Sequence, residues 1–261
     1  MLFKVPRNIE RRNASPNMDL YDYLIGAYDA YLHILKRNGK SVTEEKIYYS
    51  DIYAIKDMHA LLKGELILFV SSGITNIIYN TVSEEVILKL INVIENKLNG
   101  YKQKIKMDSI EIENTLRITG SLDFLFINLS NKLKRINPAV NLAAYQPNII
   151  INRKSPELKE QLKYKKCIIS KTAFLSNDNE LIILEQEISK RRKGKEELDY
   201  SYLYIPYKNI TGAKMYRFDR EQDLSSMEIC AGNQRFTYIF ENRNKHILNV
   251  YNKLSGAGYI Q

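Results

Sequence analysis

Ile205-Pro206-Tyr207-Lys208-Asn209-Ile210 repeats the pattern of Ile47-Tyr48-Tyr49-Ser50-Asp51-Ile52, about 158 positions further along the chain. Both stretches have isoleucine at each end, tyrosine third and Asp or Asn fifth. A second pair, Leu90-Ile91-Asn92-Val93 and Ile247-Leu248-Asn249-Val250, occurs at nearly the same spacing and in the same order. Two matches with a common spacing indicate an internal repeat. We therefore expect two copies of one domain.

The length and composition agree with such a duplication. A chain of 261 residues accommodates two domains of roughly 100 residues and a connector. The hydrophobic content of 44% and the charged content of 26% are typical of globular proteins. No apolar run approaches the roughly 18 residues of a membrane-spanning helix, and the N-terminus lacks the apolar segment of a signal peptide. We expect a soluble, cytoplasmic protein.

The first half begins with strand-like segments and ends in an amphipathic helix. Segments 28–36 and 46–55 are rich in β-favouring residues, and Asn38-Gly39 between them is a hairpin signal. The apolar residues between Val86 and Leu98 recur at helical spacing. This order of strands followed by one helix predicts a first domain over residues 1–100.

The second half repeats this order. The predicted strands are 166–175, 181–188, 203–210, 226–230 and 235–240. A helix from about 244 to 254 follows them. We assign the second domain to residues 158–261.

The connector, residues 101–157, contains an amphipathic helix at about 121–136. Its aromatic, leucine and basic positions are Phe124, Phe126, Leu129, Lys132, Lys134 and Arg135. An apolar stripe beside basic residues is typical of a helix that lies in a membrane surface. The same stripe fits docking against one or both domains, which is the more economical interpretation. Both interpretations stay open.

The repeated motif resembles that of bacterial pleckstrin-homology-like (PH-like) domains. In that family a strand of the form Ile-Pro-Tyr-x-x-Ile runs into the second sheet, and the stretch 205–210 matches it best. Tyr79-Asn80 and Phe240-Glu241-Asn242 resemble the last strand of the family and its exit towards the helix. The resemblance covers about residues 20–99 and 160–257. It implies an α+β, mainly β fold, with two PH-like domains joined by the helix-containing connector. Each domain would be a bent antiparallel sheet or partly open barrel capped by a C-terminal helix.

The resemblance also bears on ligands. In some eukaryotic members, basic residues flanking the first two strands bind phosphoinositides, whereas bacterial members often act without them. The nearest counterparts in this chain are Lys165, Lys166 and Lys171. Eukaryotic members usually carry a tryptophan in the last helix. This chain has no Trp, and we expect Tyr251 to fill that space.

Patterns typical of catalysis or metal binding are missing from the sequence. His33, His59 and His246 are far apart, and no carboxylate or cysteine spacing completes a metal site around them. No glycine-rich loop leads from a strand into a helix, and no serine has the frame of a nucleophile elbow. We expect a protein that is not an enzyme and that uses no cofactor and no metal.

The net charge of +9 is unevenly distributed. Residues 1–100 carry equal numbers of basic and acidic side chains, so residues 101–261 hold the whole excess. Five positive charges are concentrated in one loop, at Lys190, Arg191, Arg192, Lys193 and Lys195. Each basic residue near an anionic membrane contributes on the order of 1 kcal/mol, so this loop indicates reversible membrane attachment. A solvated hairpin tip in a lysine-rich chain explains the same run, and both interpretations stay open.

These patterns favour a binding or scaffold protein that recognises a protein partner at a sheet edge or in a groove beside a helix. The alternative is a peripheral membrane adaptor, in which the basic loop and the connector helix meet anionic lipid at the inner face of the membrane. Nucleic-acid binding is less favoured, because the basic run precedes the tyrosines at 200–207 instead of alternating with them. The copies pair either within one chain or between chains, as a homo-oligomer, and both arrangements stay open.

Overall fold

The repeated stretch forms the corner at which each half passes from one sheet to the next. In the computed structural model, Tyr49–Asp51 and Tyr207–Asn209 each form a 3-10 turn between two strands that belong to different sheets. The side chains of Tyr49 and Tyr207 are both buried. The motif is thus a corner whose tyrosine packs into the core.

The structure describes residues 1–7, 9, 13, 15, 17–98, 105–109, 124–154, 164–187, 199–219 and 223–257. The strands of the first half are β1 (Leu2–Pro6), β2 (Tyr21–Ala27), β3 (Tyr31–Asn38), β4 (Ser41–Tyr48), β5 (Ile52–Ala60), β6 (Lys63–Val70) and β7 (Gly73–Asn80). A 3-10 turn at Thr81–Ser83 leads into helix α1 (Glu84–Leu98). Strands β1 to β4 form one antiparallel sheet, and β5 to β7 belong to a second.

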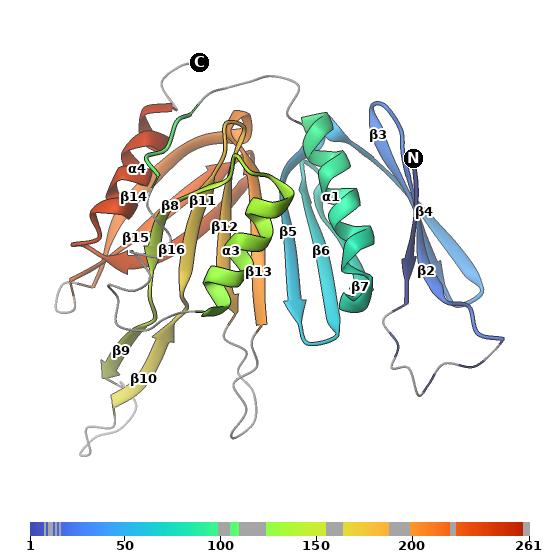
Figure 1. Ribbon diagram of the computed structural model, residues 1–261, viewed down its shortest axis with the longest axis horizontal. Coiled ribbons are helices and arrows are strands. Elements are labelled where there is room, and N and C mark those ends of the chain that lie inside the picture. The colour runs from blue at the N-terminus through green and yellow to red at the C-terminus, as the bar shows by residue number, and fades with distance from the viewer. Residues whose placement is uncertain are drawn as a thin grey trace.

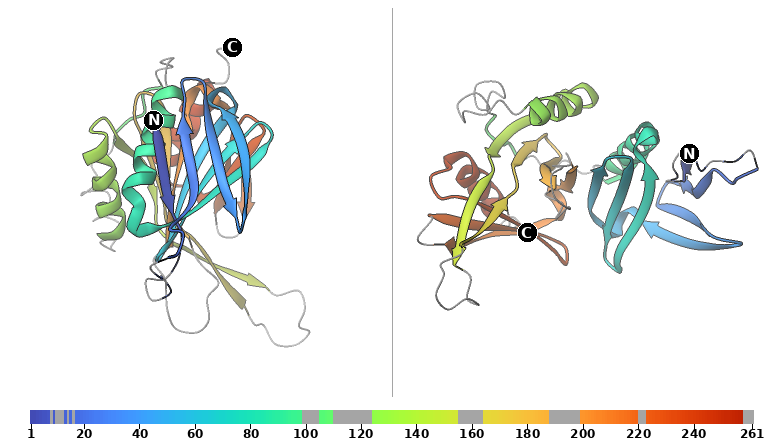
Figure 2. Two further views of the ribbon diagram at one scale, coloured as in Figure 1. Left: turned by 90° about the vertical axis from the view of Figure 1, so that its right-hand side faces the viewer. Right: turned by 90° about the horizontal axis from the view of Figure 1, so that it is seen from below.

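Helix α3 (Phe124–Ile136) precedes the second half. The strands that follow are β8 (Asn141–Gln146), β9 (Ile149–Lys154), β10 (Tyr164–Ile169), β11 (Thr172–Ser176), β12 (Glu180–Glu187), β13 (Asp199–Pro206), β14 (Ile210–Asp219), β15 (Leu224–Ala231) and β16 (Gln234–Glu241). Helix α4 (Lys245–Ala257) follows them. Strands β9 and β10 form a separate ribbon that projects from the body (Figure 2). With that ribbon set aside, each half consists of four strands, three further strands and one helix.

One seven-stranded sheet joins the two halves, in the order β7-β6-β5-β13-β12-β11-β8 (Figure 1). The three-stranded part of the first half meets the four-stranded part of the second where β5 pairs antiparallel with β13. In this register His59 lies opposite Tyr200, and Ile55 lies opposite Tyr204. Because backbone hydrogen bonds cross this seam, the halves share one sheet instead of meeting only through side chains.

The sequence-based boundaries differ from the structure at several points. The segment 46–55, expected to be one strand, is interrupted by the 3-10 corner at Tyr49–Asp51. The segment 166–175 is likewise two strands, since β10 pairs with β9 while β11 pairs with β8 and β12. The range 101–157, expected as a connector, contains β8 and β9 in addition to the helix. Strand β8 is almost wholly buried and forms an edge of the seven-stranded sheet.

The seven-stranded sheet is buried on both faces at its centre. Along β12, Leu181 and Ile183 belong to the core of the second half, while Ile182 and Leu184 face a core shared with the first half and with α1 and α3. Strand β13 alternates in the same way, with Tyr202 and Tyr204 in the shared core. Period-two alternation with apolar residues on both sides produces the continuous apolar runs seen in the sequence.

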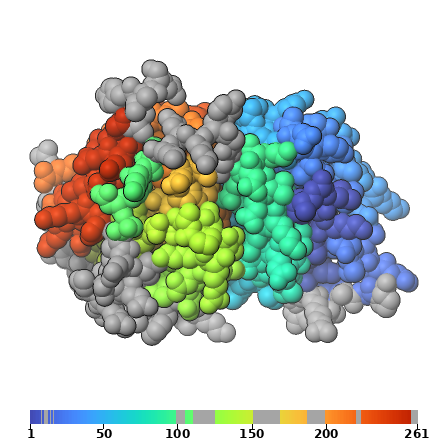
Figure 3. Space-filling view, turned by 45° about the horizontal axis from the view of Figure 1, so that its top comes forward, coloured from blue at the N-terminus to red at the C-terminus, as the bar shows by residue number. Residues whose placement is uncertain are grey.

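Helices α1 and α3 lie on one face of this sheet (Figure 1), and they are neighbours on the surface of the molecule (Figure 3). They bury apolar side chains from both halves in the shared core, among them Ile94 of α1 and Phe126 of α3. The molecule is therefore mainly β with helices packed on its sheets. Among the described helices, none combines the length and the apolar character needed to cross a bilayer.

Candidate functional site

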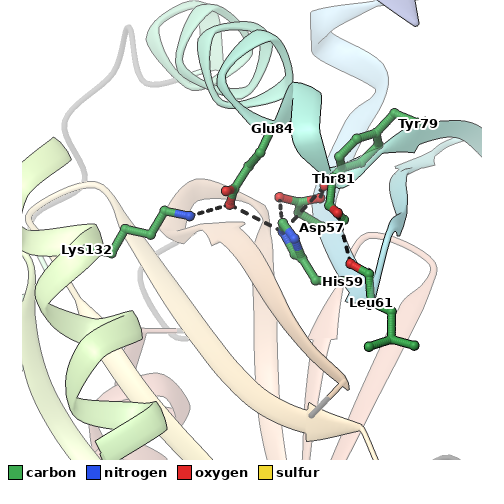
Figure 4. A network of polar contacts seen from close by, with 7 residues as sticks. All are labelled: Asp57, His59, Leu61, Tyr79, Thr81, Glu84 and Lys132. Carbon is green, nitrogen blue, oxygen red and sulfur yellow. Dashed lines mark hydrogen bonds and ion pairs between the residues drawn. The ribbon is translucent and has the colours of Figure 1, made fainter. Parts of the chain in front are cut away.

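A buried polar network lies beneath the N-terminus of α1 (Figure 4). Its centre is Asp57 of β5, which is 0% exposed. The Tyr79 hydroxyl donates a 2.5 Å hydrogen bond to Asp57 Oδ1, and His59 Nε2 lies 2.9 Å from Asp57 Oδ2. Gly64 makes room for this arrangement, because any side chain at that position would collide with the Tyr79 ring.

The network extends from the first half into α3 and the second half. Glu84, at the start of α1, lies 3.8 Å from His59 Nε2 and also forms an ion pair with Lys132 of α3. The His59 ring stacks on the ring of Tyr200 from β13, with centroids 4.6 Å apart. Residues of β5, β7, α1, α3 and β13 thus meet at one place. The contacts of this polar network therefore connect the two halves and stabilise their arrangement.

The phenols around this network are held in their neutral form. Burial raises the pKa of Tyr79, and the neighbouring Asp57 carboxylate raises it further. Burial also raises the pKa values of Tyr200 and Tyr202, with smaller contributions from nearby acidic groups. These hydroxyls therefore keep their protons near neutral pH, and that of Tyr79 is available for its bond to Asp57.

A cavity of about 450 Å³ lies at the interface between the two halves, between α1, α3 and the β11–β12 turn. We call it the interhelical cleft. It is lined by Leu88, Ile91, Asn92, Glu95, Asn96, Leu133, Ile136, Asn137, Val140, Asn177, Asn179, Glu180, Ile182 and Tyr204. Ligand sites occur preferentially in cavities of this size at domain interfaces. The cleft needs both halves, since α1 comes from the first and β12 from the second.

Two carboxyl groups, one from each half, meet in the interhelical cleft. Glu180, at the start of β12, is 2% exposed. The amide of Asn177 donates to Glu180 Oε1 at 2.9 Å, and Asn177 Oδ1 accepts the Glu180 backbone N–H at 3.0 Å. Glu95 of α1 lies within hydrogen-bonding reach of Glu180. Within the described part of the chain, no nitrogen or hydroxyl donor reaches the buried oxygens Glu180 Oε2 and Glu95 Oε1, so only a proton on one carboxyl group can join the two.

The environment favours protonation of this pair. Burial raises the pKa of Glu95 well above its ordinary range, and the Glu180 charge raises it further. Burial raises the pKa of Glu180 to about 7, against the opposing hydrogen bonds from Asn177 and Glu95. The pair therefore shares protons near neutral pH, as two close carboxyl groups in a poorly solvated site do.

The cleft is acidic although the chain is basic. Among the described residues that line it, Glu95 and Glu180 are the only ones that carry a charge, whereas the whole chain has a net charge of +9. A second hollow, beside β2 and β3, contains charges of both signs. There Arg7 lies 3.0 Å from Asp22, and Arg37 forms an ion pair with Asp19. In the interhelical cleft, by contrast, the described lining places no basic side chain beside the two acidic ones.

The basic positions predicted as an anionic-surface site are not assembled by the described structure. Lys190, Arg191, Arg192, Lys193 and Lys195 lie outside the described residues. Lys165 and Lys166 belong to β10, at positions whose side chains are also outside the description. Lys171 precedes β11, where its backbone carbonyl accepts the Gln186 N–H at 3.1 Å.

Most of the described site residues predicted on the connector helix, α3, contact the rest of the molecule. Phe126 is 0% exposed, Leu129 is buried, and Lys132 forms the ion pair with Glu84. Lys134 is half-buried and Arg135 is exposed at the end of α3. Phe124 begins the helix, and its side chain lies outside the described part. The described apolar stripe of α3 thus packs in the shared core.

Sequence reasoning missed both parts of this interface. Nothing in the sequence links His59 to Asp57, Glu84 and Lys132. Glu180 opens an apolar run directly after an Asn-rich turn, which is a weak signal for a buried carboxylate. Glu95 lies 85 positions earlier, and no local pattern pairs the two.

In the described ranges, no group of three or more histidine, cysteine or acidic residues could hold a metal ion. A comparison with protein-family models matches none of them, and no curated protein sequence matches the chain significantly.

Proposed function

We propose that the chain is a non-catalytic binding module, built from two PH-like domains, that recognises a protein partner in the interhelical cleft. The PH-like assignment is supported by the order of four strands, three strands and one helix in each half, with the repeated motif at each corner. It is also supported by α1 and α4, which follow the last strand of each half.

The observation that carries the proposal is the composition of the cleft. Helices α1 and α3 and the β11–β12 turn enclose it jointly, so a partner that enters it contacts both halves. The shared sheet holds these elements in fixed relation, and a preformed site loses less conformational entropy on binding. The arrangement corresponds to a groove beside a helix, one of the common modes of peptide recognition.

The lining favours recognition over chemistry. Its described residues include no histidine, cysteine or serine that would serve the two carboxyl groups as a nucleophile or a further proton-transfer group. Asparagine amides surround the acidic pair, and apolar side chains form the walls. Such a combination orients a bound group through hydrogen bonds while excluding water around it.

The peripheral membrane adaptor is the weaker alternative. Its two supports were the basic loop at 190–195 and the apolar stripe of the connector helix. Phe126 and Leu129 of that stripe are buried in the shared core, so they do not face a bilayer in this arrangement. The basic loop, outside the described residues, remains as its only support.

Site-specific photocrosslinking in cells of the source organism tests the proposal. A photoreactive phenylalanine replaces the exposed Asn96 at the cleft, and in a control it replaces the exposed Lys40 in the β3–β4 turn. The proposal predicts a discrete protein adduct from position 96 that is absent from position 40. It also predicts that Ile136→Trp, which fills the cleft from its 42% exposed side chain, abolishes this adduct.

The matched control for the filling variant is Ile74→Trp, at a 57% exposed position on β7 away from the cleft. It adds the same bulk to the surface and should leave the adduct unchanged. Equal adducts from positions 96 and 40, or an adduct that survives Ile136→Trp in the folded protein, would rule out the cleft as the binding site.

A further inference from the structure

The residues that line the interhelical cleft indicate the chemical class of its ligand. We propose that it binds an alkylammonium group, the end of a lysine side chain of the protein partner, between the carboxylates of Glu95 and Glu180. This inference rests on the proposed function, because it names the group by which the partner is recognised.

The floor of the cleft lacks a donor when both carboxyl groups are ionised. Glu180 is 2% exposed and satisfies Oε1 through Asn177, but apart from a proton on Glu95 no donor in the described chain reaches its Oε2. Glu95 Oε1, on α1, is likewise buried, and no nitrogen or hydroxyl donor among the described residues reaches it. A buried acceptor without a partner lowers stability, and it does so more strongly when it is charged. A cationic donor placed between the two groups would remove this cost for both.

The walls fit the rest of a lysine side chain. Ile91, Leu133 and Ile182 come from α1, α3 and β12, so apolar surface surrounds the acidic floor on several sides. Lysine carries a compact ammonium with three donors on a flexible four-carbon stem. The stem packs on apolar walls while the charged end reaches the polar groups. The acidic residues of the cleft also attract a cationic side chain.

A divalent metal ion fits the floor less well. Calcium takes six to eight oxygen ligands, and magnesium demands near-ideal octahedral geometry. The described cleft supplies two carboxylates, and the chain as described has no cluster of three potential acidic or nitrogen ligands. An ammonium needs only hydrogen-bond acceptors and one or two negative charges, which this floor provides.

Proton and ammonium compete for the same place. Without a ligand the pair shares protons, because burial raises the pKa of Glu95 and of Glu180, the latter to about 7. The other titratable groups near the pair are Tyr204 of β13 and Tyr207 of the 3-10 corner, both with raised pKa values and hence neutral. Asp178 in the β11–β12 turn is exposed to solvent. Binding of an ammonium therefore displaces a proton, and the affinity should rise with pH.

The test is an NMR titration of the full chain with Nα-acetyl-lysine methylamide. The control ligand is Nα-acetyl-norleucine methylamide, which keeps the methylene stem but lacks the ammonium. We expect shifts at the cleft with the lysine ligand only. Between pH 6 and pH 8 the affinity should rise about tenfold, which is the change expected when a group with a pKa near 7 must lose its proton.

Variants identify the groups involved. Glu180→Gln and Glu95→Gln keep the shape of the side chain, and each should weaken lysine binding at pH 8 by about tenfold or more. Glu85→Gln, at an exposed position on α1, is the matched control and should change nothing. Equal binding of the norleucine ligand, unchanged affinity in both variants, or no binding at pH 8 would overturn the inference.

Two further experiments are needed. Competition with free amines distinguishes a lysine side chain from a polyamine, and crosslinking in the Glu180→Gln variant distinguishes the lysine contact from the protein-binding function. If the site binds a lysine side chain, cadaverine and spermidine should compete only weakly with the lysine ligand. Tighter binding of these free amines than of the lysine ligand would assign the site to polyamines and would refute binding of a lysine side chain of the partner. Crosslinking from position 96 that persists in Glu180→Gln would refute the lysine contact but leave the protein-binding function standing. Lysine binding without any adduct from position 96 would refute the partner function alone.

Discussion

His59 stacks on Tyr200 across the seam between the halves, with ring centroids 4.6 Å apart and planes inclined by 8°. The two residues are also directly opposite one another in the β5–β13 pairing. A cross-strand aromatic pair of this kind contributes stability beyond the backbone ladder. The contact therefore makes the joint between the two repeats part of the sheet and its core, and it holds fixed the elements that enclose the interhelical cleft.

The repeated motif itself contributes to this joint. Asn209 Nδ2 donates to the Ile52 carbonyl at 2.9 Å and to the Tyr53 carbonyl at 3.1 Å, both in the first half. Asn209→Ala should lower the free energy of unfolding by about 1–3 kcal/mol, because two partly buried hydrogen bonds are lost. Urea denaturation measures this change. Asn233→Ala, which removes a 3.4 Å bond to the Ser71 carbonyl and a 2.8 Å bond from Gln234, both exposed to solvent, is the control. A larger loss in that control would contradict the prediction.

The buried carboxylate of Asp57 should be among the most sensitive positions in the chain. Asp57→Ala leaves the Tyr79 hydroxyl and His59 without their acceptor, so we expect a loss of about 3 kcal/mol in unfolding free energy. Tyr79→Phe removes one donor only and should cost about 2 kcal/mol. Chemical denaturation with both variants checks this order. Asp29→Asn, at a fully exposed carboxylate paired with Lys97, should leave the midpoint unchanged. Equal effects at Asp57 and Asp29 would show that the network contributes nothing.

Helix α3 should be held by its apolar stripe and only weakly by its charges. Phe126→Ala removes a fully buried ring from the shared core and should cost about 3–5 kcal/mol. The Glu84–Lys132 ion pair is partly exposed, so its coupling energy should be about 0.5–1 kcal/mol. A double-mutant cycle with Glu84→Gln and Lys132→Met measures that coupling. Ile136→Ala, at the exposed end of α3, is the control for the truncation. If Phe126→Ala lowered the unfolding free energy no more than Ile136→Ala does, the conclusion that this apolar stripe holds α3 in place would be refuted.

The acidic pair predicts an unusual pH dependence of stability. Burial raises the pKa of Glu180 from 4.5 to about 7 in the folded state. A carboxyl group whose pKa is raised on folding binds more protons in the folded chain, so its contribution is fully present below about pH 4.5. It is lost as the pH rises through 7. Over this window the loss from Glu180 is at most roughly 3 kcal/mol.

Glu180→Gln tests this assignment. The variant cannot ionise, so its unfolding free energy, measured in urea from pH 5 to pH 9, should fall less steeply than that of the native chain. At pH 8 the variant should be the more stable of the two. Glu85→Gln, on the exposed face of α1, should follow the native curve. Parallel curves for Glu180→Gln and the native chain would show that the buried pair does not titrate as proposed.

Much of the local structure followed from short patterns. The Asn38-Gly39 signal forms the β3–β4 turn, where Gly39 has a φ of +64° that favours glycine. The apolar positions of 86–98 predicted the buried face of α1, whereas the corners within the repeated stretch became visible only in the structure. Boundaries failed where a corner without glycine interrupts a β-favouring run, as at Tyr49–Asp51. The run looks continuous because β-favouring residues continue through the corner, where the tyrosine is also part of the core.

Short patterns in the sequence predicted most of the elements, their order and the duplication, because helix and strand periodicity, turn residues and an internal repeat are properties of neighbouring residues or of a constant spacing. The pairing of β5 with β13, the packing of α1 and α3 on the same face and the meeting of Glu95 with Glu180 follow from long-range contacts. Antiparallel edges of similar composition have equivalent backbone donors and acceptors, so which edges pair depends on the fit of whole surfaces. The candidate site is made from contacts between distant segments, and its chemistry therefore exists only once both halves are packed together.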